Sequence, residues 1–213
     1  NICFIGSLTS GNDWHQERIK YLESISKRIE IDIYTNLTRP SFYQNVKRNF
    51  IYQRHKMSKF LNNYDASIEK IRYYANKENL PIYDRLDDSS ISGMTKPAVY
   101  GLDMLNTLSS YKITFNKHIP LANDFAGNMR LTESSGVGTC LLSDHKKNNK
   151  DYFGEFVKYC SYKSIDEFIN KYEYLIENND LINTISKNIK QITLSKFNTD
   201  NQFQRLYNLI SIL

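Results

Sequence analysis

The chain has 213 residues, and its 28 lysines and arginines outnumber 23 acidic residues, which gives a formal net charge of +5 at pH 7. Apolar residues make up 40% of the sequence and aromatic residues 13%, so the chain can bury a core and is neither disordered nor collagen-like. The longest uncharged apolar run, near 137–143, is much too short to span a bilayer.

The three cysteines indicate a reducing environment. Cys3, Cys140 and Cys160 lie far apart and match no metal-ligand spacing, so we predict free thiols and no metal site. No basic region followed by an apolar region is present, so we expect a cytoplasmic protein. Because Asn1 opens directly into an apolar run, we expect this chain to be part of a longer protein whose N-terminal part is absent.

The first 35 residues predict a strand, a helix and a second strand. The apolar run at 1–7 ends in Gly6 and Ser7, which is typical of a buried strand followed by a tight turn. A helix is predicted over 13–28, and the alternation at 30–35 predicts the second strand. Strand, helix and strand in this order open a parallel α/β sheet.

An inserted segment at 40–95 interrupts this pattern, and we predict that it is helical at about 40–78 and turn-rich at 84–93. Basic and aromatic residues interleave over 39–64 without an acidic residue before Asp65. This stretch is interpreted as the polar face of a helix pair, as a surface for anionic lipid or a lipid-diphosphate acceptor, or as a nucleic-acid surface. No nucleic-acid motif accompanies it, so we do not expect a nucleic-acid partner.

Alternating helices and strands return after residue 95. Pro97 opens a predicted helix, and Ser164 with Glu167 forms a capping box that opens a later one. The predicted elements are a helix at 97–109, a strand at 111–116, a loop at 117–127, a helix at 128–135, a strand at 137–142, a helical turn at 151–154, a strand at 156–160, and helices beginning near 164, 181 and 203. Together they predict an α/β fold with a Rossmann-like, mostly parallel sheet of five or six strands and helices on both faces.

The most informative segment is AGNMRLTESSGVG at 126–138. A loop delivers small residues to a helix start, where free backbone amides and the helix dipole favour an anion. Arg130 adds a positive charge, and Glu133 can accept hydrogen bonds from a ribose diol. The alternative is a loop-capped helix in which the glycines serve packing and both charged side chains are solvated.

This segment resembles the "aGNMRlfEatGvG" signature of the CgeB-like glycosyltransferases of the spore maturation protein type, which have the GT-B fold. Three other stretches agree in the same order, namely FIGSLTSGNDWHQERIKYLESI, KPAVYGLDMLNTLSSYKITFNKHI and CLLSDHKKNNKDYFGEFVKYCSYKSIDEFINKYEYLIEN. The resemblance covers most of the chain outside the inserted segment. It implies the C-terminal, donor-binding half of a GT-B enzyme, which holds a UDP or GDP sugar without a cofactor or metal and pairs with a missing acceptor-binding half.

The resemblance also implies site residues. It places Glu133 at the donor ribose and His118 at the sugar or phosphate. Many related retaining enzymes carry two glutamates eight positions apart; Phe125 stands at the first of these positions, and Asp124 beside it is a candidate substitute. The residues implied at the nucleotide sugar are Gly6, Ser7, Arg18, Asn116, Gly127, Asn128, Met129, Arg130 and Glu133.

Other interpretations stay open from the sequence. His118 can be a solvated loop histidine, and Arg18 can pair with Glu17 or Asp13. A Rossmann-like dehydrogenase or small-molecule binding module is an alternative, although GSLTSGND after the first strand does not match GxGxxG. A basic interaction surface at 39–64, peripheral at the inner face of the cell membrane, is a further alternative.

Overall fold

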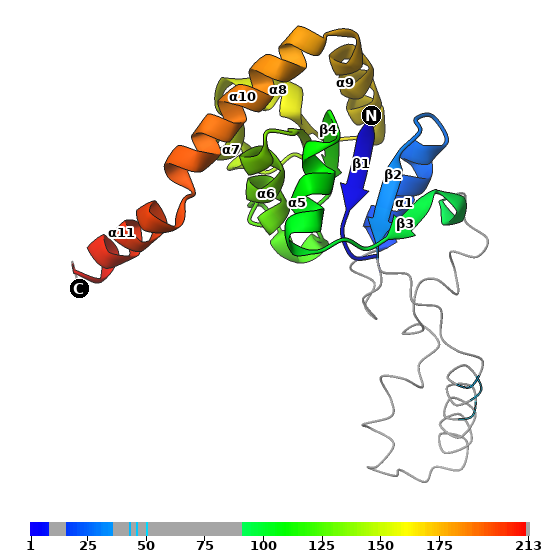
Figure 1. The fold of residues 1–213 in the computed structure, drawn as a ribbon, viewed down its shortest axis with the longest axis horizontal. Coiled ribbons are helices and arrows are strands. Elements are labelled where there is room, and N and C mark those ends of the chain that lie inside the picture. The colour runs from blue at the N-terminus through cyan, green and yellow to red at the C-terminus, as the bar shows by residue number, and fades with distance from the viewer. Residues whose placement is uncertain (9–15, 36–42, 44–45, 47–49, 51–90, 212–213) are drawn as a thin grey trace.

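The computed structural model describes residues 1–8, 16–35 and 91–211 together with the single positions 43, 46 and 50 (Figure 1). The helical insertion predicted at about 40–78 therefore lies almost wholly outside the described residues. The same holds for most of the predicted loop at 84–93 and for the predicted start of the first helix at 13.

The described residues form one parallel sheet in the order β3-β2-β1-β4-β5-β6. Its strands are β1 (Ile2–Ile5), β2 (Asp32–Thr35), β3 (Thr95–Pro97), β4 (Ile113–Asn116), β5 (Cys140–Asp144) and β6 (Ser161–Tyr162). β1 lies in the middle, where Cys3 is opposite Asp32 of β2 and Ile2 is opposite Ile113 of β4. The parallel α/β sheet that the sequence predicts is thus confirmed.

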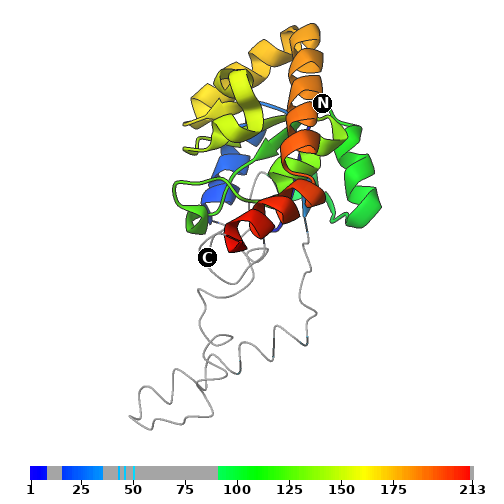
Figure 2. The same cartoon turned by 90° about the vertical axis from the view of Figure 1, so that its left-hand side faces the viewer.

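Helices cover both faces of this sheet (Figures 1 and 2). In β1, Ile2 and Phe4 join the larger apolar cluster with α1, whereas Cys3 and Ile5 pack with Leu108 of α5. This alternation follows from the pleat of a strand, which sends successive side chains to opposite faces. The helices are α1 (Gln16–Ser26), α5 (Gly101–Ser109), α6 (Met129–Val137), α7 (Asn149–Phe153), α8 (Val157–Cys160), α9 (Ile165–Glu177), α10 (Asn179–Lys196) and α11 (Thr199–Ile210). All three cysteines are free and buried, as predicted.

The strand predicted at 156–160 is wrong. A 3-10 turn at Gly154–Phe156 leads directly into α8, and the strand that follows is the two-residue β6. Phe153 and Cys160 are fully buried, and Val157 between them is partly buried. Apolar residues spaced by three or four positions are typical of a helix, so the stretch from Phe153 to Cys160 has a helical period that the predicted strand at 156–160 did not take into account.

The helix predicted from Pro97 is also wrong at its start. Pro97 ends β3, where it is opposite Thr35 of β2, and α5 begins only at Gly101. β3 is an edge strand, and edges tolerate proline because one side of the strand needs no ladder hydrogen bond. The strand predicted at 137–142 begins later, at Cys140, because α6 continues to Val137 and ends at Gly138, whose φ of 87° is left-handed.

The C-terminal part of the chain is helical. The predicted capping box opens α9: Ser164 Oγ accepts a hydrogen bond from the Glu167 amide at 3.1 Å, while Glu167 Oε2 accepts from the Lys163 amide at 2.7 Å. α11 extends away from the sheet, and Phe203 is 66% exposed (Figure 1). Among the described residues, no helix is long and apolar enough to cross a membrane.

Candidate functional site

The candidate site lies where the strand order reverses. From β1 the chain builds outward through β2 and β3 and then returns to β4 on the other side of β1. In open parallel sheets, ligands bind outside the carboxyl ends of the two strands that flank this reversal. Gly6 and Ser7 follow β1, and His118 follows β4 closely. The sequence-predicted segments therefore meet at the edge where a ligand crevice is expected.

Asn116, the last residue of β4, connects this edge to the start of α6. Its side chain donates to Ser143 Oγ at 2.8 Å and accepts from Asn128 Nδ2 at 2.8 Å. Asn128 is the N-cap residue of α6, yet its side chain accepts no capping hydrogen bond from that helix. An asparagine at this position ordinarily caps the first turn. Here the Asn128 side chain instead points to Asn116 of β4. The first backbone amides of α6 therefore have no side-chain cap, and another acceptor can take its place.

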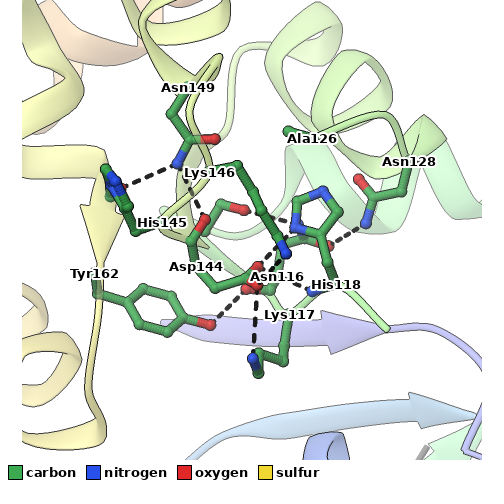
Figure 3. Close-up of polar contacts among 12 residues, drawn as sticks. Asn116, Lys117, His118, Ala126, Asn128, Asp144, His145, Lys146, Asn149 and Tyr162 are labelled. Atoms are coloured by element: carbon green, nitrogen blue, oxygen red, sulfur yellow. Dashed lines mark hydrogen bonds and ion pairs between the residues drawn. The ribbon is translucent and has the colours of Figure 1, made fainter. Parts of the chain in front are cut away.

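His118 is held by a carboxylate beside this helix start (Figure 3). Asp144 Oδ1 lies 2.7 Å from His118 Nδ1 and accepts the His118 backbone amide at 2.9 Å. The His118 side chain is 1% exposed, and its Nε2 is buried without a hydrogen-bond partner among the described residues. A buried polar atom without a partner is costly, so its position here points to a ligand that supplies one.

Two lysines approach the other oxygen of Asp144. Lys117 Nζ is 3.6 Å and Lys146 Nζ 3.9 Å from Asp144 Oδ2, and Lys117 also pairs with Glu17 at 2.9 Å. Burial alone would raise the pKa of Asp144, but the hydrogen bonds from His118 and the charge of Lys117 outweigh it and lower that pKa. Asp144 therefore stays a carboxylate near neutral pH, in surroundings of mainly positive charge.

Arg18 of α1 bridges the loops that follow β1 and β4. Its Nε and Nη2 donate to the Lys117 carbonyl oxygen at 3.0 and 2.7 Å, and its Nη1 donates to the Ser7 carbonyl oxygen at 3.0 Å. The guanidinium also lies over the Phe4 ring, 5.7 Å from its centroid. Burial lowers the pKa of Arg18, while the charge of Asp144 opposes this shift. The structure thus gives Arg18 bonds that fix the loops after β1 and β4.

Arg130 and Glu133 form an ion pair within α6. Arg130 Nη1 is 3.0 Å from Glu133 Oε2, with the two side chains 15% and 20% exposed. The same Nη1 lies 3.1 Å from Met104 Sδ of α5. Burial lowers the pKa of Arg130, and the Glu133 charge opposes that shift. The two side chains are therefore paired and only partly exposed, whereas the alternative interpretation expected both to be solvated. Met129, at the helix start, is 74% exposed.

A family model described as "Glycosyl transferase-like" matches residues 83–208, which is more than half of the chain. The chain belongs to this glycosyl transferase-like family. The match includes β4, the start of α6 and β5, so it covers the segments that carry Asn116, Asn128 and Asp144. Of the segments that build the crevice, the one around Gly6, Ser7 and Arg18 lies before the matched range.

A solved structure, that of Anabaena HepE, has the same fold as this family member. Anabaena Alr3699/HepE, solved in complex with UDP, aligns over 100% of this chain and 48% of its own, with a TM-score of 0.55 and 11% identity. The catalytic domain of cholesterol-alpha-glucosyltransferase from Helicobacter pylori aligns over 91% of this chain and 96% of its own, with a TM-score of 0.49 and 12% identity. The chain spans about half the length of HepE, and the likeness confirms the predicted Rossmann-like fold of a GT-B domain. No curated protein matches the chain significantly.

Asp124, the predicted substitute for a sugar-contacting acid, lies on the surface of this glycosyl transferase-like domain. It pairs with Lys147 at 2.6 Å, and its side chain is 52% exposed. The Lys147 charge lowers the pKa of Asp124. The loop behind it is held by Asn148, whose side chain exchanges hydrogen bonds of 2.6 and 2.9 Å with the backbone of Ala126. Asp124 is thus directed to Lys147, and its role at the sugar stays a prediction.

Gly6 has a packing reason of its own. Its amide donates to the Tyr34 carbonyl oxygen at 3.1 Å, which continues the pairing of β1 with β2. A Cβ added at Gly6 would lie 2.9 Å from Phe4 Cζ. Glycine is therefore required here by the ring beneath it. Gly127 differs, because a Cβ there would meet no described atom within 4 Å, so the space beside the start of α6 is open.

Asp144 is not among the site residues predicted from the sequence. A signal for it existed, because Asp144 ends β5 just as Asn116 ends β4, and ligands of parallel sheets bind beside the carboxyl ends of the strands. Its place beside His118 depends on the pairing of β4 with β5, which puts Asn116 opposite Ser143.

Among the described residues, no group of three or more His, Cys, Asp or Glu side chains can hold a metal ion.

Proposed function

We propose that this chain is the donor-binding half of a GT-B glycosyltransferase and binds a nucleotide-diphosphate sugar at the carboxyl edge of β1 and β4. One observation carries the proposal: the start of α6 has no side-chain cap, and His118 Nε2 is buried beside it without a partner among the described residues. Family membership and the HepE complex with UDP support the same ligand class.

The diphosphate is expected at the start of α6. Exposed amides and the positive end of the helix dipole bind phosphate, and the space beside Gly127 is open. In sugar transfer, an acceptor hydroxyl loses its proton and its oxygen forms a bond to the anomeric carbon, while the bond between that carbon and the diphosphate oxygen breaks. The departing nucleoside diphosphate thereby gains negative charge. A helix start and a histidine that face this charge stabilise the departing group. Arg130 is the second residue of α6, and Glu133 lies one turn further on, where it is proposed to bind the ribose.

The finer features of the function belong to the same proposal. The motif resemblance supports the CgeB-like subtype and a second, acceptor-binding half, and the chain spans only about half of HepE. The three free cysteines support a cytoplasmic enzyme. UDP is favoured over GDP because HepE was solved with UDP. The proposed acceptor is a cell-surface glycan, a lipid-linked sugar or a protein. The basic segment at 39–64 is a candidate to approach a lipid surface.

Titration calorimetry on the 213-residue chain tests the proposal, with UDP, GDP and NAD as ligands. We expect saturable binding of UDP, weaker binding of GDP and no binding of NAD. Binding of NAD in place of a nucleoside diphosphate would instead support the Rossmann-like dehydrogenase. If no nucleoside diphosphate binds at millimolar concentration, the proposed donor site is wrong.

Two variants locate the ligand. His118→Gln removes the imidazole, and a lost charge-assisted hydrogen bond of about 1.5–3 kcal/mol lowers the UDP affinity roughly tenfold or more. His145→Gln is the matched control, since His145 Nδ1 contacts Ser161 Oγ at 3.3 Å, away from the start of α6. Glu133→Gln should weaken UDP by about tenfold through the ribose. Equal loss in His118→Gln and His145→Gln would show that the effect is not local.

A further inference from the structure

Asp144 makes two contacts with one residue, and these fix the orientation of a ring. The backbone amide of His118 and its ring Nδ1 both lie within hydrogen-bond distance of the same Asp144 oxygen, at 2.9 and 2.7 Å. Rotation of the imidazole about its first side-chain bond would break the ring contact while the amide contact stayed. The ring is therefore held with Nδ1 toward β5 and Nε2 on the opposite edge, toward the start of α6 (Figure 3).

Positive charges around Asp144 keep its carboxyl group ionised, and this fixes the direction of its hydrogen bonds. Lys117 from the loop after β4 and Lys146 from the loop after β5 face Asp144 Oδ2 at 3.6 and 3.9 Å. Arg18 of α1 donates to the Lys117 carbonyl oxygen, and Asn128, the N-cap residue of α6, donates to the Asn116 side chain. A carboxylate in these surroundings is ionised and can only accept hydrogen bonds.

A carboxylate acceptor at Nδ1 requires that Nδ1 carries a proton. In the neutral ring the second nitrogen, Nε2, then has a lone pair; in the charged ring Nε2 carries a second proton. Without a carboxylate acceptor at Nδ1, a neutral imidazole prefers to carry its proton on Nε2. A diphosphate oxygen only accepts hydrogen bonds, so Nε2 must carry a proton to bind it, and the ring, with both nitrogens protonated, is then a cation held against the Asp144 carboxylate.

We propose that Asp144 is a positioning residue: it holds the His118 ring with its first proton on Nδ1 and keeps Nε2 directed at the ligand of the α6 start. The assignment of that ligand as a nucleoside diphosphate rests on the proposed function, whereas the orientation and the proton position do not. Asp144 touches no ligand itself and acts through His118. Loss of the Asp144 carboxylate should therefore change the proton position on the His118 ring even in a variant that still folds.

The proton position is measured by long-range nitrogen–proton correlation spectra of the histidine rings in the ligand-free, 213-residue chain. The sequence has four histidines, and His118→Gln assigns the signal by its loss. We expect the neutral wild-type His118 ring to show the Nδ1-protonated pattern. In Asp144→Asn, where the amide can either donate or accept, the pattern should move toward Nε2 protonation. Asp166→Asn, which removes an exposed carboxylate paired with Arg28 at 2.7 Å, should leave the pattern unchanged.

Titration of the same variants with UDP provides the second readout. Asp144→Asn should bind UDP roughly tenfold more weakly than wild type, while Asp166→Asn binds as wild type does. If the neutral His118 ring of wild type carries its proton on Nε2, the inference is wrong. This result does not depend on whether the Asp144 variant folds. If UDP does not bind wild type at all, the proposed function fails while the ring signal still decides the role of Asp144. If UDP binds and both readouts are unchanged in Asp144→Asn, the function stands and this role is wrong.

Discussion

Asn128→Asp separates stability from ligand binding at the start of α6. In wild type, Asn128 donates to Asn116 at 2.8 Å and does not cap its own helix. An aspartate cannot donate, so it either rotates to cap α6 or accepts from a flipped Asn116 amide. The lost hydrogen bond and the gained cap are each about 1 kcal/mol, so the free energy of unfolding should change by less than about 1 kcal/mol.

The binding free energy should change much more. The new carboxylate stands where the phosphate is proposed to bind. A unit charge about 5 Å from a phosphate charge costs roughly 3 kcal/mol at an effective dielectric constant of about 20. Screening by salt reduces this figure, so we expect UDP to bind between about 10-fold and 100-fold more weakly. Calorimetric titration with UDP and urea unfolding of the same samples measure both quantities.

Two control variants identify the cause. Asn128→Ala removes the hydrogen bond without adding charge, and it should lower stability by about 1 kcal/mol and affinity by less than about fivefold. Asn198→Asp makes the same substitution at the N-cap of α11, far along the chain from the crevice, and should leave UDP affinity unchanged. If Asn128→Asp binds UDP as tightly as wild type, the diphosphate does not lie at the start of α6.

Three further variants test the structure around the site. Arg18→Lys replaces the guanidinium, whose three nitrogens bond the Ser7 and Lys117 carbonyl oxygens, by a single ammonium nitrogen, so urea unfolding should show a loss of about 2 kcal/mol; an unchanged midpoint would contradict the bridge. The pKa of Asp144 is lower in the folded state, so its stabilisation is complete above its unfolded pKa of about 3.9 and is lost as pH falls through the folded pKa. The stability difference between wild type and Asp144→Asn should therefore shrink from pH 7 to pH 3, and a constant difference would refute the shift. Gly138→Ala places a side chain at a φ of 87°, so thermal unfolding should show a loss of about 1 kcal/mol, and an equal melting temperature would mean that the helix end relaxes.

The sequence predicts the central sheet well and its edges poorly. β1, β4 and β5 are apolar runs whose residues are almost all buried, and such runs identify themselves by composition. β3 reads Thr-Lys-Pro, and Lys96 and Pro97 are exposed. Of these residues only Thr95 favours a strand, whereas lysine and proline are depleted in strands. β3 exists because its backbone pairs with β2, which is a tertiary effect that local patterns do not contain.

The candidate site was likewise only partly predictable from the sequence. Asn116, His118 and Asn128 could be selected from the motif resemblance, and they end a strand, follow one and cap a helix, respectively. The partners that give them their roles could not be read from spacing alone, since Asp144 reaches His118 only through the pairing of β4 with β5. Arg130 and Glu133 are three positions apart on a helix, which permits an ion pair. Whether that pair is buried depends on the position of α5, which the sequence does not specify.

The central place of β1 has a consequence for how the protein is made. Ile2 of β1 is opposite Ile113 of β4, so the two strands are joined only after more than one hundred further residues have been synthesised. At about 5–20 residues per second, β4 follows β1 from the ribosome by roughly 6–20 seconds. During that interval, one side of an apolar strand has no neighbour, and unpaired apolar strands promote aggregation. We therefore expect the yield of folded protein to depend on chaperones and on the rate of translation more than its final stability would suggest.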